Sequence, residues 1–534
     1  MKGRSLLKTF GALSFVTTLL GGQAALAMDF GEYVEKLLQK RSLELFGVVK
    51  PIQDSAPSTV GEYREVGQAA NAQVKIARGL EVEYVTREAG NLADMFAFYP
   101  DADNPTHLVF CIEGGREEIG SLSSGMTKYN PAVQTVQLDN GAVRTILRGM
   151  NRCDGIRRTS WGTYLVTEET SDGGAYEIMS PLSFENYTVQ DRSSGAIVQP
   201  DGMPDHDFVV KRTALPTLRW EGLTVLDEGV VILGDELRPG TDMEDTDGGA
   251  IYKFIPDNPH THGAVISSLA SSPFVSGNVY ALQISCRDDA QQFGQGCEIG
   301  NGVWLPVSAN NAPTDADQLG ATGYYRPEDL HKDPTYEGRG VLFCWTNTGN
   351  RGADNFAETL CGVDQEPLLA SEDERTVTVN RFVEGDPDFN SHDNLAIQPI
   401  TGIVYVIEDN PNGDIFACLP DGDDRDIKTD GCVKILSVRD SSAEPTGFEF
   451  DASGTTAYLS IQHSADGNMP AVDDYPTDDI LKITGFTIPH GFEKNFETPG
   501  FKKRGSKKRG YWKHDFGKDR PGRRGFERDD YDLQ

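Results

Sequence analysis

From about Pro51 to about residue 487, the chain repeats one pattern, a short apolar run followed by a turn rich in Gly, Asp, Asn or Pro. The clearest runs span residues 161–167, 229–233, 250–255, 278–284, 340–345, 402–407, 414–419, 456–461 and 479–484. Many short runs separated by turn signals predict an all-β sandwich, barrel or propeller. More than 400 residues exceed one sandwich, whereas a propeller accommodates them by repeating a four-stranded blade. We therefore predict a six-bladed β-propeller over residues 61–490.

The two ends of the mature chain depart from this pattern. Residues 28–60 begin with apolar positions near helical spacing, such as Tyr33, Val34 and Leu37, and predict a short N-terminal helical segment. Residues 500–534 combine glycine with twelve basic and six acidic side chains and show no apolar period, which predicts a basic disordered tail. Such a tail would either contact cell-envelope polyanions or serve only as a solubilising segment.

Residues 1–27 have the organisation of a signal peptide. Basic residues precede an apolar run at residues 10–20, and Ala25-Leu26-Ala27 offers a cleavage site before Met28. No later stretch is apolar enough to cross a bilayer, so we predict no membrane span in the mature chain. The sequence thus predicts export to the periplasm, the cell surface or the medium.

The charge of the chain is strongly negative and unevenly distributed. The whole chain carries −33, and residues 28–499 hold 34 basic and 76 acidic residues, a net charge of −42. Such a body is a poor partner for nucleic acid or acidic lipid. It suits divalent cations or a saline medium, or it is simply a solvated surface.

Export makes the eight cysteines candidates for disulfide bonds. Six of them lie in close sequence pairs, namely Cys286 with Cys297, Cys344 with Cys361, and Cys418 with Cys432. Cys111 and Cys153 remain. They would either bond each other or leave Cys153 free for a task such as metal binding.

Carboxylates gather at the ends of the predicted strands. They are Glu168 and Glu169, Glu221, Asp235 and Glu236, Glu328, Asp393, and Glu444. The strands of a propeller lead into one central channel, so carboxylates from distant parts of the sequence can converge there. Bound cations would relieve their mutual repulsion, and Ca²⁺ takes 6–8 oxygen ligands. A thiolate among them would instead suit a transition metal. Consecutive strand residues such as Glu168 and Glu169 point to opposite faces.

These motifs together resemble a known family. Cys153 with WGTYLVTEE, then RWEGLTVLDEGVVILGDE, YKFIP, RPEDL, DNLAIQP and EPTGFEFDASGTTAYLSIQH follow the order found in the PhoX family of secreted alkaline phosphatases. The resemblance covers residues 151–463. It implies a six-bladed propeller whose channel holds two ferric ions and two or three calcium ions, with a cysteine among the ligands. It also implies hydrolysis of small phosphomonoesters, sometimes with diesters, and we expect a monomer.

The resemblance also implies a role for each matching residue. The implied metal ligands are Cys153, Glu168, Glu169, Glu221, Glu236 with Asp235 as the alternative, Glu328, Asp393 and Glu444. Arg326 is the implied phosphate clamp, since a guanidinium matches phosphate oxygens in a bidentate way. Arg326 and Glu169 are the predicted catalytic residues. The chain has one residue more between Cys153 and Trp161 than the family usually has.

Two other functions compete with this prediction. One is a calcium-dependent propeller hydrolase such as a lactonase, which would use one calcium ion and have no need of Cys153. The other is a non-catalytic extracellular binding or matrix protein, in which the propeller is a scaffold and the basic tail is the active part.

Overall fold

The structure is a computed structural model. It describes residues 30–59, 63–239, 248–261, 263–284, 298–410, 412–420, 431–463 and 467–488. The predicted signal peptide, the basic tail and the pair Cys286 with Cys297 lie outside these residues.

The described residues form an all-β unit with few helices, as predicted. The three α-helices are α1 (Phe30–Lys40), α2 (Ser42–Leu45) and α3 (Ala312–Leu319), and short 3₁₀ turns lie at Ala70–Ala72, Leu269–Ser271, Pro273–Val275 and Arg351–Ala353. The first two helices lie where the sequence predicts a helical segment. Leu38 of α1 is buried in the same apolar cluster as residues of the neighbouring sheets. None of the helices in the described ranges is long and apolar enough to cross a membrane.

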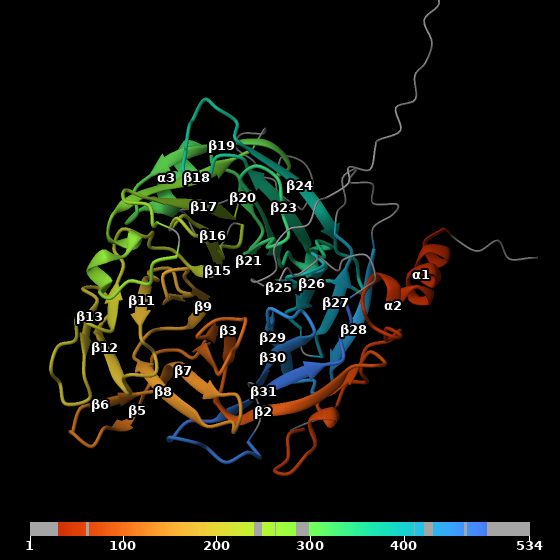
Figure 1. The fold of residues 1–534 in the computed structure, drawn as a ribbon, viewed down its shortest axis with the longest axis horizontal. Coiled ribbons are helices and arrows are strands. Elements are labelled where there is room, and N and C mark those ends of the chain that lie inside the picture. Colours follow the sequence, from red (N-terminus) through yellow and green to blue (C-terminus); the bar gives the residue numbers. More distant parts are fainter. Residues whose placement is uncertain are drawn as a thin grey trace, which may run out of the picture. The chain divides into compact units, whose positions relative to one another are not determined.

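The strands form sheets arranged around a common centre (Figure 1). One sheet contains β13 (Ala196–Val198), β12 (Tyr187–Asp191), β8 (Val143–Arg148), β7 (Pro131–Gln137), β4 (His107–Ile112) and β3 (Ala93–Tyr99). A second contains β14 (Val209–Lys211), β11 (Ala175–Met179), β10 (Thr163–Glu168) and β9 (Cys153–Arg158). A two-stranded ribbon of β5 (Glu118–Ser121) and β6 (Thr127–Tyr129) lies apart from them.

The largest sheet follows next in the chain. It contains β15 (Trp220–Val225), β16 (Val231–Asp235), β17 (Gly249–Pro256), β18 (Gly277–Gln283), β19 (Gly300–Val307), β24 (Val377–Glu384), β23 (Glu358–Asp364), β22 (Val341–Asn347) and β21 (Pro327–Lys332), with β20 (Gly323–Tyr324) paired to β17. Another sheet contains β1 (Val74–Ile76), β28 (Cys432–Val438), β27 (Asp414–Cys418), β26 (Val404–Glu408) and β25 (His392–Ile397). The last contains β2 (Glu81–Gly90), β31 (Thr477–Thr484), β30 (Thr456–His463) and β29 (Ala443–Phe450).

The innermost strands close a ring. The strands β3, β9, β15, β21, β25 and β29 lie next to one another in this order, and β29 lies next to β3 (Figure 1). The strand β2 closes the ring by pairing with β31. Glu81 lies opposite Thr484 at one end of this pairing, and Gly90 lies opposite Thr477 at the other. Pairing a strand from near the start of the unit with one from near its end covers edges that would otherwise be open. The arrangement is therefore propeller-like.

The apolar core lies between neighbouring sheets rather than in the ring's centre. Trp161 and Leu165, beside and within β10, pack in one buried cluster with Trp220 and Leu223 of β15. Every residue of β10 is buried, because this strand is covered on both faces and paired on both edges. With apolar side chains filling the spaces between sheets, the centre of the ring is left to polar residues.

Disulfide bonds tie adjacent strands. Cys344 of β22 is bonded to Cys361 of β23, and Cys418 of β27 is bonded to Cys432 of β28. Two of the three predicted pairs are thereby confirmed.

Candidate metal centre

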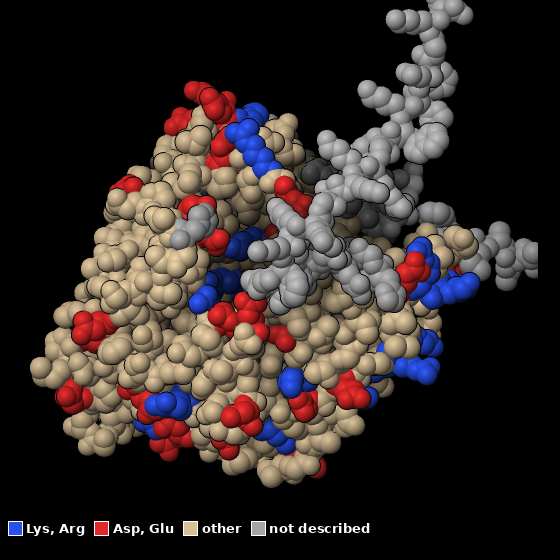
Figure 2. All heavy atoms as spheres, viewed as in Figure 1, with Lys and Arg blue, Asp and Glu red and all other residues tan. Residues whose placement is uncertain are grey.

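A polar cavity of about 370 Å³ opens at one end of the ring. Its lining residues are Leu92, Asp94, Glu113, Gly115, Arg152, Asp154, Glu169, Glu221, Arg326, Glu328, Asp393, Asp409, Glu444 and Gln462. Nine of these fourteen residues are carboxylates and two are arginines. We call this cavity the acidic hollow. Figure 2 shows acidic and basic side chains meeting in a hollow near the middle of the face that it draws.

One repeated position supplies most of the acidic side chains. The second residue of each of the six innermost strands is a carboxylate, in the order Asp94, Asp154, Glu221, Glu328, Asp393 and Glu444. All six line the acidic hollow. Since each of these strands begins at the hollow, the same position in each strand points to the same centre.

The strand that follows each innermost strand adds a second group of acids. Glu113, Glu169 and Asp409 come directly after β4, β10 and β26. An antiparallel partner ends where its neighbour begins, so these residues arrive beside the first group. Glu236 occupies the same position after β16, but it does not line the hollow.

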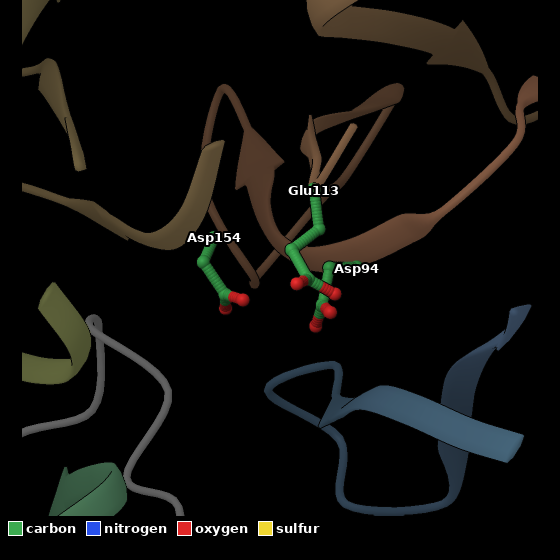
Figure 3. Close-up of side chains that lie close together, drawn as sticks. All are labelled: Asp94, Glu113 and Asp154. Atoms are coloured by element: carbon green, nitrogen blue, oxygen red, sulfur yellow. The ribbon is translucent and has the colours of Figure 1, made fainter. Parts of the chain in front are cut away.

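Three sets of carboxylates lie close enough to share a cation. Each set offers three oxygen atoms within 4.8 Å of one another, and the sets are Asp94 with Glu113 and Asp154, Asp154 with Glu169 and Glu221, and Glu221 with Glu328 and Asp393. Figure 3 shows the carboxyl groups of the first set pointing into the same space. Asp154 and Glu221 each belong to two sets, so seven carboxylates form one continuous chain. Carboxylate oxygens are hard donors and suit hard cations such as Ca²⁺.

Burial and mutual repulsion make these acids hard to ionise without a cation. Burial first, and then the charge of Glu113, raise the pKa of Asp94 to about 8 and that of Glu169 to about 10. Burial first, and then other carboxylates, also raise the pKa values of Asp154 and Glu221 well above the usual range. Cations bound among the carboxylates would take over the role of these protons.

Three arginines reach the carboxylates of the centre. Arg152 Nε lies 2.6 Å from Glu169 Oε2, and Arg326 Nη2 lies 3.0 Å from Glu328 Oε1. Arg326 Nε also bonds Glu236, which lies 3.2 Å from Arg219 Nη1. Burial alone would raise the pKa of Glu236, but Arg326, a hydrogen bond with Glu169 and then Arg219 together outweigh burial and lower it. Glu236 is therefore a charged support behind Arg326 and belongs to none of the three sets of carboxylates found in the described residues.

Two predicted ligands face away from the hollow, because consecutive strand residues alternate in direction. Glu168 is paired across the sheet with Cys153, and its carboxylate accepts hydrogen bonds from Arg192 Nε at 2.7 Å and the backbone N of Asn151 at 2.8 Å. Asp235 is paired with Trp220 in the same way and accepts from the backbone N of Arg219 at 3.0 Å. Glu168 and Asp235, which the resemblance implies as ligands, therefore lie outside the hollow, whereas Glu169, the neighbour of Glu168, lines it.

The predicted ligand Cys153 does not line the hollow either. Its Sγ atom is bonded to Sγ of Cys111, 42 residues earlier, and the residue is fully buried. A disulfide sulfur carries no thiolate charge, so the structure contradicts Cys153 as a metal ligand and bears out the alternative bond with Cys111.

The remaining predicted residues Glu169, Glu221, Arg326, Glu328, Asp393 and Glu444 all line the hollow. Sequence reasoning missed Asp94, Glu113, Arg152, Asp154 and Asp409. Asp94 and Asp154 occupy the same position in their strands as four predicted acids, so an alignment of the repeats would have found them.

A propeller-like ring with carboxylates and arginines at its centre defines a class of protein that can hold cations and anionic groups in one hollow. The comparison with protein families then identifies the family. The family model described as alkaline phosphatase PhoX matches residues 130–465, and the chain belongs to this family. The resemblance predicted from the motifs is confirmed, and the chain is an alkaline phosphatase. Comparison with curated proteins gives no match.

One solved structure shows the same fold. The chain resembles the PhoX of Pseudomonas fluorescens in complex with vanadate, a transition-state analogue, with 16% identity and a TM-score of 0.53. The likeness covers 82% of this chain and 98% of that one. A gluconolactonase from Xanthomonas campestris matches with 10% identity, 82% and 99% coverage, and a TM-score of 0.35.

Proposed function

We propose that the acidic hollow hydrolyses small phosphomonoesters with the help of bound ferric and calcium ions. The observation that carries this proposal is the continuous chain of seven carboxylates ending beside Arg326. Seven carboxylates offer enough oxygen donors for several hard cations, and a buried oxygen of Asp154 has no hydrogen-bond partner within the described residues. The residues present fit hard cations. The implied numbers, two ferric and two or three calcium ions, rest on the family resemblance.

Arg326 is the proposed clamp for the phosphoryl group. Its guanidinium is held by Glu236 and Glu328, while Nη1 lies 3.7 Å from Asp409, too far for a hydrogen bond. The clamp is thus fixed in orientation, with donor capacity left toward the hollow. A fixed guanidinium can hold two oxygens of a phosphoryl group in the geometry of its fork.

The acidic side chains hold the two arginines that line the hollow in place. Arg152 bridges Glu113 and Glu169 and lies on the side of the first two sets of carboxylates. The two arginines would therefore hold oxygens of the substrate that do not react. Bound cations would supply positive charge to the phosphoryl oxygens, which is the main requirement for catalysis of phosphoryl transfer.

The proposed architecture has six blades. The ring of six innermost strands supports this number, as does the acidic residue repeated at the second position of each strand. In the largest sheet, β19 and β24 pair over only Gly300–Gly302 opposite Val377–Val379. This short seam would divide the sheet into the blade that begins with β15 and the blade that begins with β21.

We further propose that the protein is exported and is a monomer. The family and the disulfide bonds support an oxidising compartment outside the cytosol. The proposed regions of the chain are a signal peptide (1–27), a helical segment (28–60), a propeller (61–490) and a basic tail (500–534) that contacts polyanions.

Elemental analysis of the purified protein, combined with assays on a chromogenic phosphomonoester and on a lactone, tests the function. We expect iron and calcium together with phosphate release and without lactone opening. Calcium alone with lactonase activity would replace the proposal with the calcium hydrolase. A protein that hydrolyses neither compound after loading with both metals would support the binding protein.

A further inference from the structure

At the start of β9, Asp154 rather than Cys153 faces the acidic hollow. Cys153 is paired with Glu168 across the sheet, and directly opposed strand residues place their side chains on one face. That face is the one with the Cys111–Cys153 bond. Asp154, the next residue, takes the opposite face and lines the hollow.

The carboxylate of Asp154 has no hydrogen bond that accounts for its burial. Its side chain belongs to a residue that is 2% exposed, and within the described residues its Oδ1 atom has no hydrogen-bond partner. Burying an acceptor without a partner is unfavourable unless another group binds it. Figure 3 shows this carboxylate pointing toward those of Asp94 and Glu113. Because those neighbours are also acids, a cation is the partner that would suit this carboxylate.

Asp154 is also the residue at which two of the candidate cation positions meet. It shares one set with Asp94 and Glu113 and the next with Glu169 and Glu221.

We propose that Asp154 bridges two cations and makes this an all-oxygen metal centre with no sulfur ligand. The inference rests on the proposed function only in taking this centre as the catalytic one. Cation binding is a separate property that can be measured without catalysis. An all-carboxylate donor set selects hard cations such as Ca²⁺ and Fe³⁺, and it gives no preference to soft ions that thiolates bind.

The disulfide then has a positioning role. Cys111 lies two residues before Glu113, and Cys153 lies directly before Asp154. The bond joins the end of β4 to the start of β9, and it thereby fixes two of the three ligands in the first set relative to each other.

The test measures bound metal rather than activity alone. Three variants are each loaded with calcium and iron and examined by elemental analysis and calcium calorimetry. They are Asp154→Asn, the double variant Cys111→Ser/Cys153→Ser, and the control Asp139→Asn, at an exposed aspartate that does not line the hollow. We expect Asp154→Asn to lose at least one bound cation. The double variant should keep the full number and bind calcium somewhat more weakly, because the bond no longer fixes Glu113 and Asp154 relative to each other.

A full complement of cations in Asp154→Asn overturns the proposal, as does loss of iron in the double variant. Asp154→Glu provides a second carboxylate variant if the amide variant does not fold, and it should restore at least part of the calcium binding. Failure of the proposed function is distinguishable, because the original chain would then bind cations without hydrolysing a phosphoester.

A second cavity beside the acidic hollow has the opposite charge. It has a volume of about 320 Å³ and shares Arg326 and Asp409 with the hollow. Two further arginines, Arg238 and Arg351, line it, and Asp409 is its one carboxylate. We call it the arginine cavity.

Arg351 brings a positive charge that its neighbours do not neutralise. Its Nη1 atom lies 3.3 Å from Oδ1 of Asn410 and 3.5 Å from Oδ1 of Asn390, both of which are neutral amide oxygens. Of the carboxylates in the described ranges, none forms an ion pair with it. A cleft whose lining holds more basic than acidic side chains attracts negatively charged ligands.

From this second observation we infer that the arginine cavity binds a second phosphoryl group, carried by the leaving group of the substrate. This inference rests on the proposed function, because the first phosphoryl group must lie at Arg326. The preferred substrates are then bisphosphorylated compounds rather than simple monoesters.

The second test compares fructose 1,6-bisphosphate with fructose 6-phosphate by phosphate release. Arg351→Gln should raise KM for the bisphosphate about tenfold and leave kcat and the kinetics with the monophosphate unchanged. Arg339→Gln, at an exposed arginine paired with Glu366, is the matched control. Equal effects on both esters, or no effect on either, would overturn the subsite alone. Hydrolysis of neither ester by the original chain would overturn the proposed function and the subsite with it.

Discussion

The Nη2 atom of Arg326 lies 3.0 Å from Oε1 of Glu328, two residues further along the chain. The two residues stand at the start of β21, and Arg326 has a left-handed backbone with φ of 59°. Such a conformation is uncommon for a residue other than glycine. It turns the guanidinium back toward a carboxylate of the third candidate cation set, so that the proposed phosphate clamp and a proposed metal ligand act as one unit.

Replacing the clamp should therefore impair catalysis more than folding. We expect Arg326→Gln to lower kcat/KM for a phosphomonoester roughly 100-fold, because charged hydrogen bonds to the phosphoryl group are lost. This corresponds to a loss of about 2–3 kcal/mol of transition-state stabilisation. Steady-state kinetics measure this change. Arg326→Lys should recover only part of the activity, since an ammonium group cannot form the bidentate contact. An Arg326→Gln enzyme with normal kcat/KM would exclude the clamp.

Removing the bound cations should lower the free energy of unfolding, and the decrease should be larger when more cations are bound. A ligand at 100 times its Kd adds about 2.7 kcal/mol of unfolding free energy, so thermal unfolding should shift upward as calcium is added to chelated protein. Glu221 belongs to two of the candidate sets, and Glu221→Gln should reduce this shift. Asp139→Asn is again the control and should keep the full shift. A chelated protein whose unfolding temperature does not respond to calcium or iron would contradict the metal centre.

A buried ion pair far from the hollow gives a prediction on stability. Lys253 Nζ lies 2.7 Å from Asp364 Oδ2, and both side chains are fully buried. Lys253→Met leaves a buried carboxylate without its cation and should cost about 3–5 kcal/mol, measured by denaturant unfolding. The double variant Lys253→Met/Asp364→Asn should recover much of this loss. Equal stability of Lys253→Met and the original chain would show that the pair contributes little.

The pH dependence of stability should contain a contribution from Glu358. Burial first, opposed by Arg381, raises the pKa of this carboxyl to about 7, whereas a glutamate in the unfolded chain titrates near about 4.3. Between these values the folded chain holds the extra proton, so the unfolding free energy falls as the pH rises from about 4.3 to about 7. Glu358→Gln should flatten this part of the curve by up to about 3 kcal/mol. Unfolding curves at several pH values measure the slope, and an unchanged slope would contradict the assignment.

The basic tail should be dispensable for turnover. Residues 500–534 carry twelve basic side chains and lie outside the described residues. Deletion should leave kcat with a small phosphomonoester unchanged and reduce retention on a polyanionic matrix at low salt. A large loss of kcat would assign the tail to the catalytic unit.

The sequence by itself determined the class of fold and part of the centre. The spacing of apolar runs gave many short strands, and the short loops between paired cysteines placed Cys344 next to Cys361 and Cys418 next to Cys432. These features depend on neighbours in the chain, so local reasoning is sufficient. Four of the six repeated acids, Glu221, Glu328, Asp393 and Glu444, were also predicted from motifs that end or begin a strand.

Only the tertiary structure decided which side chains face the centre. A shift of one residue reverses every side chain of a strand, and the pairing of β9 with β10 is irregular between Val166 and Glu168. This irregularity sets Glu168 opposite Cys153, and so it places Glu169 and Asp154 together in the hollow. Strand alternation is visible in the sequence, but its absolute direction depends on hydrogen-bond register and on the closing of the ring. The centre of this phosphatase is therefore built by carboxylates that the chain pattern marks only as strand ends.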